Sequence, residues 1–321
     1  MECGDLRILF AANPEIASKT LVALHENFNV VGVLTNEDKP VGRSKRLEMP
    51  PVKKQALELG IPVLQFERLL TEARNKTKEL KPNFLISFAC GHYFGPKYLD
   101  LFPLGAINIH PSLLPLYRGC APLQFALLNG ETKTGITIQR ITAIIDSGNI
   151  LNQMEFPLKG SETYLTISEK IASLAPEMVV ETLNKLCAKE IEETVQNHPE
   201  ATFTTMLTKE DGLIDWNKDA KTIHCQIRAL YPWPKASTTY DGKQLIMASV
   251  SEPLEEVGLE KVPPNVIAGT VLHLDKKKGL AIATGDGLLY VNRLQLAQKK
   301  EMDSLSFYNG NPNIIGSILG G

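Results

Sequence analysis

The sequence predicts an α/β fold in which a doubly wound, mostly parallel, Rossmann-like sheet is followed by a small OB-like β-barrel domain. In the first half of the chain, continuous apolar runs alternate with helical patterns, as expected for parallel strands buried on both faces. Beyond residue 230 the pattern changes to short apolar runs separated by turn signals such as Asp241-Gly242. The length of 321 residues suits two domains.

The first half begins with a βαβ unit. An apolar run at 6–12 predicts a strand, Asn13-Pro14 marks a turn, and a helix is expected from Pro14 to about residue 26, before a strand at 28–34. The turn lacks GxGxxG, so the dinucleotide fingerprint is absent. The further expected strands are 61–64, 83–89, 105–110, 135–140 and 150–156. The further expected helices are 52–59, 68–80, 121–128 and 161–188, the last with a kink or break at Pro176.

The second half contains the expected domain boundary. Polar, Glu/Thr-rich residues with little periodicity predict a linker at 191–209, between an N-terminal domain at 1–190 and a C-terminal domain at 210–321. A helix at 219–230 should open the C-terminal domain. The five short strands expected to form its barrel are 237–240, 244–250, 269–274, 279–284 and 287–294.

Composition indicates a soluble cytoplasmic protein. An apolar fraction of 43% with 22% charged residues is ordinary for a globular chain, and a net charge of −2 restricts any polyanion site to a local patch. The five cysteines are odd in number and never form a CxxC pair, which argues against a disulfide framework or a structural zinc site. We find neither a signal peptide nor an apolar run of about 20 residues, so we expect no membrane association.

The segment 36–51 differs in kind from its surroundings. It holds three prolines, one glycine and four basic residues, and it is too long for a tight connection. The basic residues are Lys39, Arg43, Lys45 and Arg46, with Lys53 and Lys54 shortly after. Composition leaves two interpretations open: a mobile basic loop that contacts a phosphate backbone, or a solvated flexible loop.

Candidate catalytic residues gather in the stretch 104–151. Asn108 and His110 lie two residues apart in an apolar run, so they should project from the same face of a strand. Asp146 follows the next apolar run, and a carboxylate near an imidazole fixes its tautomer and orientation. Such a set suits acyl transfer to a nucleophile that belongs to the substrate, with the protein supplying an oxyanion site and a proton route. The alternative is that Asn108 and His110 only satisfy each other while Asp146 caps a loop.

For the residues near this stretch we expect supporting roles and no catalytic ones. Ligands of open α/β sheets bind at the carboxyl ends of strands, so the backbone around Phe88–Gly91 is a candidate pocket wall. We interpret His92 as a polar residue with its hydrogen bonds satisfied locally. Cys120 has no distinct partner base, and we interpret it as a small packing residue rather than a nucleophile.

The motif Asn-x-His-Pro-Ser-Leu-Leu-Pro-x-Tyr-Arg-Gly at 108–119, followed by Asp-Ser-Gly at 146–148, closely resembles the folate-dependent formyltransferases. Over nearly the entire chain the likeness narrows to the methionyl-tRNA formyltransferases. The segments that resemble this narrower family are the basic stretch 38–46, the stretch 207–216 like its interdomain crossing, and the stretches 228–234 and 283–287 like its C-terminal domain.

The resemblance implies transfer of the formyl group of 10-formyltetrahydrofolate to the α-amine of methionyl initiator tRNA by a monomer without a metal. Residues 1–190 would be the catalytic domain and 210–321 the tRNA-binding domain. Asn108 and His110 would stabilise the tetrahedral oxyanion, and Asp146 would position His110 and help to move protons. The implied folate contacts are Ser112, Leu113, Leu114, Pro115, Phe88, Ala89, Cys90 and Ile144. The implied tRNA contacts are Lys39, Arg43, Lys45 and Arg46.

Several positions depart from the commonest family pattern. Ala12-Asn13 replaces a usual Gly-Thr or Gly-Ser, although asparagine can adopt the left-handed geometry that such a turn needs. Cys90, Cys120 and Asn149 replace a frequent tyrosine, alanine and aspartate. None of these departures touches the three catalytic positions.

Three other functions compete with this interpretation: formyl transfer to a nucleotide or sugar amine, hydrolysis of formyl-folate, and a tRNA-binding module with a vestigial folate site. The basic segment and the second β-domain favour tRNA over the first two. An intact Asn108, His110 and Asp146 set argues against the third, because a binding module has no need of it.

The basic segment gives the first testable prediction. We expect Arg43→Ala to raise the KM for Met-tRNA far more than the KM for formyl-folate, because it removes a phosphate contact and leaves the folate site intact. Steady-state kinetics with each substrate varied in turn would measure both. Equal losses on the two substrates would show that this segment does not read tRNA.

Overall fold

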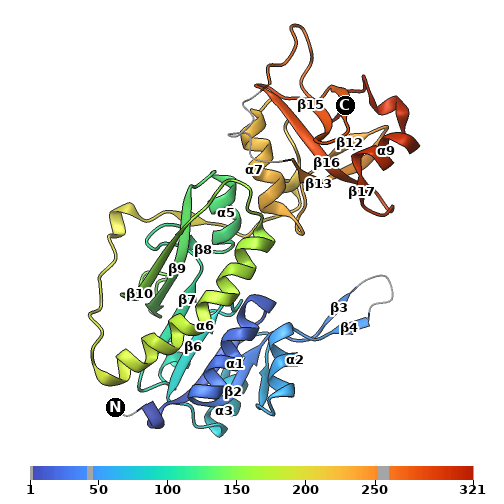
Figure 1. Cartoon of the computed structure of the whole chain (residues 1–321). Helices are drawn as coiled ribbons and strands as arrows, with labels where there is room; N and C mark the ends of the chain where they lie inside the picture. The colour runs from blue at the N-terminus through green and yellow to red at the C-terminus, as the bar shows by residue number, and fades with distance from the viewer. Residues whose placement is uncertain (1–2, 42–45, 252–259, 321) are drawn as a thin grey trace. The chain divides into compact units, whose positions relative to one another are not determined.

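The computed structural model describes residues 3–41, 46–251 and 260–320. The chain divides into two compact units (Figure 1). The first unit comprises residues 1–119, 135–156 and 168–203. The second comprises residues 120–134, 157–167 and 204–321.

The first unit is built on a seven-stranded sheet with the order β10-β9-β7-β6-β1-β2-β5. Its strands are β1 (Arg7–Ala12), β2 (Asn29–Thr35), β5 (Val63–Gln65), β6 (Phe84–Phe88), β7 (Ala106–His110), β9 (Lys133–Arg140) and β10 (Ile150–Pro157). The strands from β5 to β7 are parallel, and β9 runs antiparallel to β7. The chain leaves β1 toward β2 and later returns to its other side at β6, which confirms the doubly wound, mostly parallel sheet.

Apolar residues put the central strands in the core. All five residues of β6 are buried, and so are all residues of β1 except Arg7. Leu9, Leu85 and the aromatic residues that follow β6 form one hydrophobic cluster on this sheet. Strands buried on both faces carry continuous apolar runs, which is why their positions could be predicted closely.

The helices of the first unit lie where the sequence predicts them and differ at their ends, except α4, which was not predicted. They are α1 (Ser18–Asn27), α2 (Pro51–Glu58), α3 (Thr71–Glu79), α4 (Pro96–Leu99) and α6 (Tyr164–Ala188). Pro14 does not start the first helix, because it precedes a 3-10 turn (Glu15–Ala17) that leads into α1. Pro176 lies inside α6, so the helix does not break there.

The basic segment contains a hairpin that the sequence did not predict. Strands β3 (Lys39–Val41) and β4 (Arg46–Glu48) pair antiparallel, with Lys39 opposite Glu48. Arg43 and Lys45 lie outside the described residues.

The second unit contains a curled antiparallel sheet with the order β12-β13-β16-β15-β14, and β17 pairs with β16. Its strands are β12 (Ser237–Tyr240), β13 (Lys243–Val250), β14 (Val271–Asp275), β15 (Gly279–Ala283), β16 (Leu288–Leu296) and β17 (Met302–Asp303). The five predicted strands are all present, whereas β17 and helix α9 (Ser304–Gly310) were not predicted.

Helix α7 (Ala220–Leu230) packs on this sheet through one apolar face. Asp219 caps its first turn by accepting a hydrogen bond from the Thr222 backbone N–H at 2.8 Å. Ile223 and Ile227, one helical turn apart, are buried in the same core as Trp216. No helix in the part of the chain that the structure describes is long and apolar enough to cross a membrane.

His224 lies on the polar side of α7, in a buried hydrogen-bond network. Its Nδ1 accepts a hydrogen bond from Arg228 Nε at 3.0 Å, and Arg228 Nη1 donates to the Glu162 carbonyl at 2.6 Å. Since Nδ1 is an acceptor, the neutral ring fits this network and a protonated ring does not. Burial, followed by the charge of Arg228, lowers the pKa of His224 to about 4.

This network predicts that the second unit loses stability in mild acid. The unfolded chain takes up a proton at His224 near pH 6.5 and the folded chain only near pH 4, so stability falls as the pH drops through this window. We expect a loss of about 2 kcal/mol between pH 7 and pH 5. Both tryptophans, Trp216 and Trp233, lie in the second unit, so their fluorescence during urea unfolding reports this unit. His224→Gln should remove most of the pH dependence, and an unchanged slope in this variant would contradict the assignment.

Candidate active site

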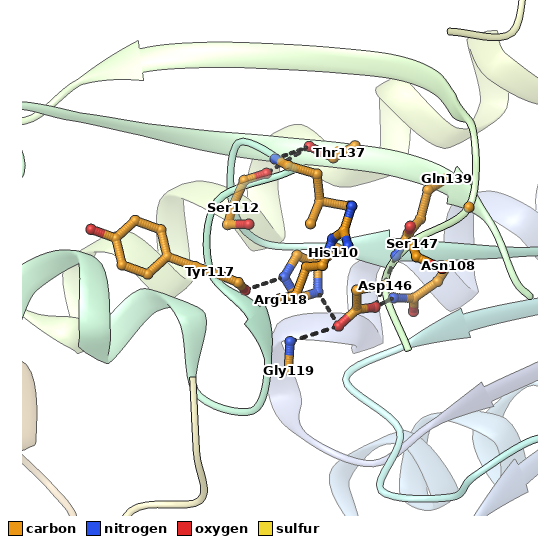
Figure 2. Close-up of polar contacts among 12 residues, drawn as sticks. Asn108, His110, Ser112, Tyr117, Arg118, Gly119, Thr137, Gln139, Asp146 and Ser147 are labelled. Atoms are coloured by element: carbon orange, nitrogen blue, oxygen red, sulfur yellow. Dashed lines mark hydrogen bonds and ion pairs between the residues drawn. The ribbon is translucent and has the colours of Figure 1, made fainter. Parts of the chain in front are cut away.

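The candidate site begins at the carboxyl end of β7. Asn108 and His110 lie on the same face of this strand, as expected from their spacing (Figure 2). On the neighbouring antiparallel strand β9, Gln139 lies opposite Asn108 and Thr137 opposite His110. Four polar side chains therefore share one face where these two strands meet.

Asp146 brings this group together. Its Oδ1 accepts hydrogen bonds from Gln139 Nε2 at 2.8 Å and from Asn108 Nδ2 at 3.3 Å. Its Oδ2 accepts one from the Gly119 backbone N–H at 2.9 Å and lies 3.5 Å from His110 Nδ1 (Figure 2). A carboxylate that is largely withdrawn from water needs such partners. The three residues singled out by the sequence thus lie together around one carboxylate.

The contacts of His110 define where its proton sits. The ring is buried, and its Nε2 lies 2.8 Å from the Tyr117 carbonyl oxygen. Because a carbonyl only accepts, Nε2 carries the hydrogen and Nδ1 of the neutral ring presents a lone pair toward Asp146. A proton taken up at Nδ1 would form an ion pair with the Asp146 carboxylate.

The Asp146 loop is held in a constrained backbone conformation. Asp146 itself is left-handed, with φ of 52°, which is uncommon for a residue with a side chain. Its carbonyl oxygen and that of Gly148 accept hydrogen bonds from Gln196 Nε2, at 3.0 and 2.7 Å. At Gly148 an added Cβ would lie 1.9 Å from the Arg140 carbonyl oxygen, so only glycine fits.

Sequence reasoning missed Gln139 and Gln196. Gln139 carried the same signal as Asn108, because Thr137 and Gln139 alternate with isoleucines in an apolar run. Gln196 carried no signal, since it is one polar residue within the polar segment predicted as a linker. In the structure it is buried, and its Oε1 accepts hydrogen bonds from the Arg118 guanidinium at 2.7 and 3.1 Å.

The loop at 112–115 is tightly held by neighbouring strands. Thr137 Oγ1 donates to the Ser112 carbonyl at 2.7 Å, and Gln153 Nε2 donates to the Leu114 carbonyl at 3.0 Å. Ser112 and Leu114 are buried, whereas Leu113 and Pro115 are partly exposed. The loop is therefore a fixed wall next to His110.

The other residues predicted to line the folate pocket range from buried to exposed. Phe88 is buried in the core, Ala89 is exposed with φ of 49°, and Ile144 is 69% exposed. The Tyr93 hydroxyl donates to the Ala143 carbonyl at 3.4 Å, so the chain after β6 and the loop before Asp146 are adjacent.

We find no sign of a reactive cysteine or a catalytic histidine in the loop that follows β6. The Cys90 thiol lies 3.5 Å from His92 Nδ1, and burial raises its pKa to about 11, so it stays protonated at neutral pH. His92 Nε2 lies 2.7 Å from the Phe66 carbonyl, which confirms a locally satisfied ring. Cys120 is exposed, so its interpretation as a packing residue was wrong. Among the described residues, no group of three or more His, Cys, Asp or Glu side chains could hold a metal ion.

Comparison with known protein families gives two matches in this chain. Residues 6–183 match the formyl transferase model, and residues 206–312 match the formyl transferase C-terminal domain. The chain is 40% identical over 314 residues to the methionyl-tRNA formyltransferase of Borrelia duttonii, covering 98% of this chain and 100% of the relative. It is 38% identical over 318 residues to that of Treponema denticola, covering 97% and 98%.

Solved structures share the fold at low sequence identity. A sugar 3N-formyltransferase, solved with dTDP and 5-N-formyl-tetrahydrofolate, matches with a TM-score of 0.63 and 18% identity over 92% of this chain and 99% of its own. A methionyl-tRNA formyltransferase from Clostridium thermocellum matches with a TM-score of 0.56 and 19% identity over 77% of this chain and 93% of its own.

The close contact at Gly148 yields a stability prediction. Gly148→Ala would push a methyl group against the Arg140 carbonyl and displace the loop that carries Asp146. We expect a loss of about 2–3 kcal/mol, typical of overpacking against backbone. Unfolding followed by circular dichroism would measure it. Gly95→Ala is the control, because an added Cβ there has its nearest neighbour at 3.6 Å. Equal stability of the two variants would contradict the prediction.

Proposed function

The chain belongs to the formyl transferase family, and from this we propose that it transfers the formyl group of 10-formyltetrahydrofolate to the α-amine of methionyl initiator tRNA. The product is N-formylmethionyl-tRNA for translation initiation. Relatives that carry the name methionyl-tRNA formyltransferase align over nearly the whole chain, which favours this amine over a sugar or nucleotide amine.

The observation that carries the chemistry is the Asp146 carboxylate shared by Asn108 and His110. The substrate amine attacks the formyl carbon, and the carbonyl electrons move to oxygen as the tetrahedral intermediate forms. Asn108 Nδ2 uses one hydrogen on Asp146 and keeps a second N–H for this oxyanion. Removing one such donor typically costs about 100- to 1,000-fold in rate.

We assign the proton route to His110 and Asp146. Because the Nε2 hydrogen of His110 is committed to the Tyr117 carbonyl, the ring accepts a proton at Nδ1, beside Asp146. The amine loses its proton as the carbon–nitrogen bond forms. The folate nitrogen gains one as its bond to the formyl carbon breaks, so protons balance. This arrangement gives His110 a proton-holding role and leaves oxyanion stabilisation mainly to Asn108.

The formyl donor is a cosubstrate, and the fixed loop at 112–115 supports a folate wall beside His110. Ala89, Cys90 and Ile144 are the other proposed contacts, from loops that the Tyr93–Ala143 hydrogen bond holds together. Phe88 would act through the position of the strand end, because its side chain is buried in the core.

For tRNA we propose the β3–β4 hairpin as the acceptor-stem contact. Lys39 and Arg46 lie on its two strands, with Arg43 and Lys45 between them in sequence. A local basic hairpin can attract the tRNA backbone even though the chain as a whole has a net charge of −2.

We further propose a catalytic domain at 1–190, a linker at 191–209 and a tRNA-binding domain at 210–321. The protein would act as a cytoplasmic monomer.

The decisive experiment is incubation with 10-formyltetrahydrofolate and Met-tRNA, with detection of the formylated aminoacyl ester. A parallel reaction without tRNA measures hydrolysis of formyl-folate, and another with an amino sugar nucleotide measures transfer to a sugar. Formate release without ester, or transfer to the sugar alone, would replace the proposed function.

The shared carboxylate predicts the effect of single substitutions. Asn108→Ala, His110→Ala and Asp146→Ala should each abolish or severely reduce formylation while the fold persists, because each removes one member of a mutually bonded set. Formylation rates, with circular dichroism as the folding control, would test this. Formylation at the wild-type rate in any of the three would exclude the mechanism.

A further inference from the structure

The root of the β3–β4 hairpin, residues 36–38, carries a polar network with no part in the chemistry described so far. Three side chains from other elements hold it: Asn13 from the end of β1, Lys53 from α2 and Gln65 from β5. We call these three side chains together with that of Asp38 the clasp.

Lys53 and Asp38 form the charged half of the clasp. Lys53 Nζ lies 2.7 and 2.8 Å from the two carboxylate oxygens of Asp38 and donates a further hydrogen bond to Gln65 Oε1 at 2.8 Å. The two side chains are 15% and 24% exposed. The Lys53 hydrogen bond is the main cause that lowers the pKa of Asp38, with Gln65 second, so Asp38 is ionised at neutral pH. All three ammonium hydrogens of Lys53 thus have partners within the protein.

Gln65 and Asn13 hold the backbone of Asn36 from both sides. Gln65 Nε2 lies 2.6 Å from the Asn36 carbonyl and 2.9 Å from Asp38 Oδ1. Asn13 Oδ1 accepts the Asn36 backbone N–H at 2.6 Å and the Thr35 hydroxyl at 2.9 Å. Asn13 therefore shapes the first turn through its side chain, and its backbone does not use the left-handed geometry that asparagine can adopt.

A hairpin of two three-residue strands needs such support. An isolated two-stranded hairpin is marginally stable at best, and ordering it on binding would reduce affinity. The clasp joins the root of the hairpin to β1, β2, α2 and β5, so it fixes the direction in which the hairpin leaves the sheet.

We infer that Asp38, Lys53, Gln65 and Asn13 are positioning residues that hold the β3–β4 hairpin ready for tRNA, and that Lys53 is not itself a tRNA contact. This inference rests on the proposed function of the hairpin. According to this inference the acidic residue Asp38 favours tRNA binding, although its negative charge by itself would repel a polyanion. The inference and a purely electrostatic account therefore predict opposite effects of removing this charge.

Asp38→Asn tests this separation directly. If only charge mattered, removal of an acid beside a basic hairpin would strengthen tRNA binding. The clasp requires the opposite: about a tenfold rise in the KM and Kd for tRNA, the effect of losing one charge-assisted hydrogen bond. The KM for formyl-folate and kcat at saturating tRNA should stay within about twofold.

Glu37→Gln is the matched control, since Glu37 is the adjacent acid, is exposed, and its side chain makes no hydrogen bond or ion pair with any of the described residues. It should leave tRNA affinity unchanged or slightly improved. Equal tRNA affinity of the Asp38→Asn and Glu37→Gln variants would overturn the inference. Should Asp38→Asn not fold, Gln65→Leu removes the link to Asn36 and carries the same expectation.

Lys53→Met compared with Lys54→Met tests the second half of the inference. Lys54 is the adjacent lysine and is exposed, so it controls for the loss of one positive charge on α2. We expect Lys53→Met to weaken tRNA binding about tenfold without changing the slope of log Kd against log salt. A slope smaller by about one would identify Lys53 as a phosphate contact and overturn this part.

Direct tRNA binding without folate keeps this test apart from the proposed function. If the wild-type protein binds tRNA and forms no formylated ester, the proposed reaction fails while the variants still judge the clasp. If the wild type formylates and the Asp38→Asn variant binds tRNA like the wild type, the clasp fails alone. Absence of tRNA binding by the wild type would overturn both.

Discussion

The site depends on the hydrogen bonding of a single carboxylate. Asp146 gathers an amide from β7, an amide from β9, a backbone N–H from Gly119 and the ring of His110. Such a group is costly to withdraw from water unless these partners are in place. Its partners come from three separate parts of the chain, so the carboxylate ties the chemistry to the packing of the sheet.

Supporting contacts extend outward from this carboxylate. Gln196 bonds the loop that carries Asp146 and also Arg118, which precedes Gly119. The Thr202 side chain and carbonyl accept the backbone N–H groups of Tyr117 and Arg118, at 2.8 and 2.9 Å. Tyr117 in turn offers its carbonyl to His110. The position of the catalytic ring is therefore set in part by residues almost a hundred positions away in sequence.

Much of the fold was predictable because it follows from local patterns. The buried strands carry continuous apolar runs, and the period of two placed Asn108 and His110 on one face of β7. Gln139 could have been found by the same reasoning, since it follows Thr137 by two residues in an apolar run. The function came through a long motif that resembles a known family, and composition alone left it open.

Other features could not be predicted, because they depend on contacts distant in sequence. Lys53 was noted just after the basic segment, and only the structure shows that Asp38 neutralises its charge and that Gln65 accepts its remaining hydrogen bond. Gln196 lay in a polar stretch where nothing distinguished it. Pro176 was expected to interrupt α6, but packing of a long helix tolerates one missing backbone donor.

The bonds from Gln196 and Thr202 also have a consequence for the order in which the chain can fold during synthesis. Asn108, His110 and Asp146 leave the ribosome first, yet Arg118, Tyr117 and the Asp146 loop gain these partners only after residue 202 has emerged. A nascent chain ending near residue 190 would contain every catalytic side chain and still lack the contacts that hold them. Completion of the site is thus delayed until the last stretch of the first unit, residues 168–203, has been made.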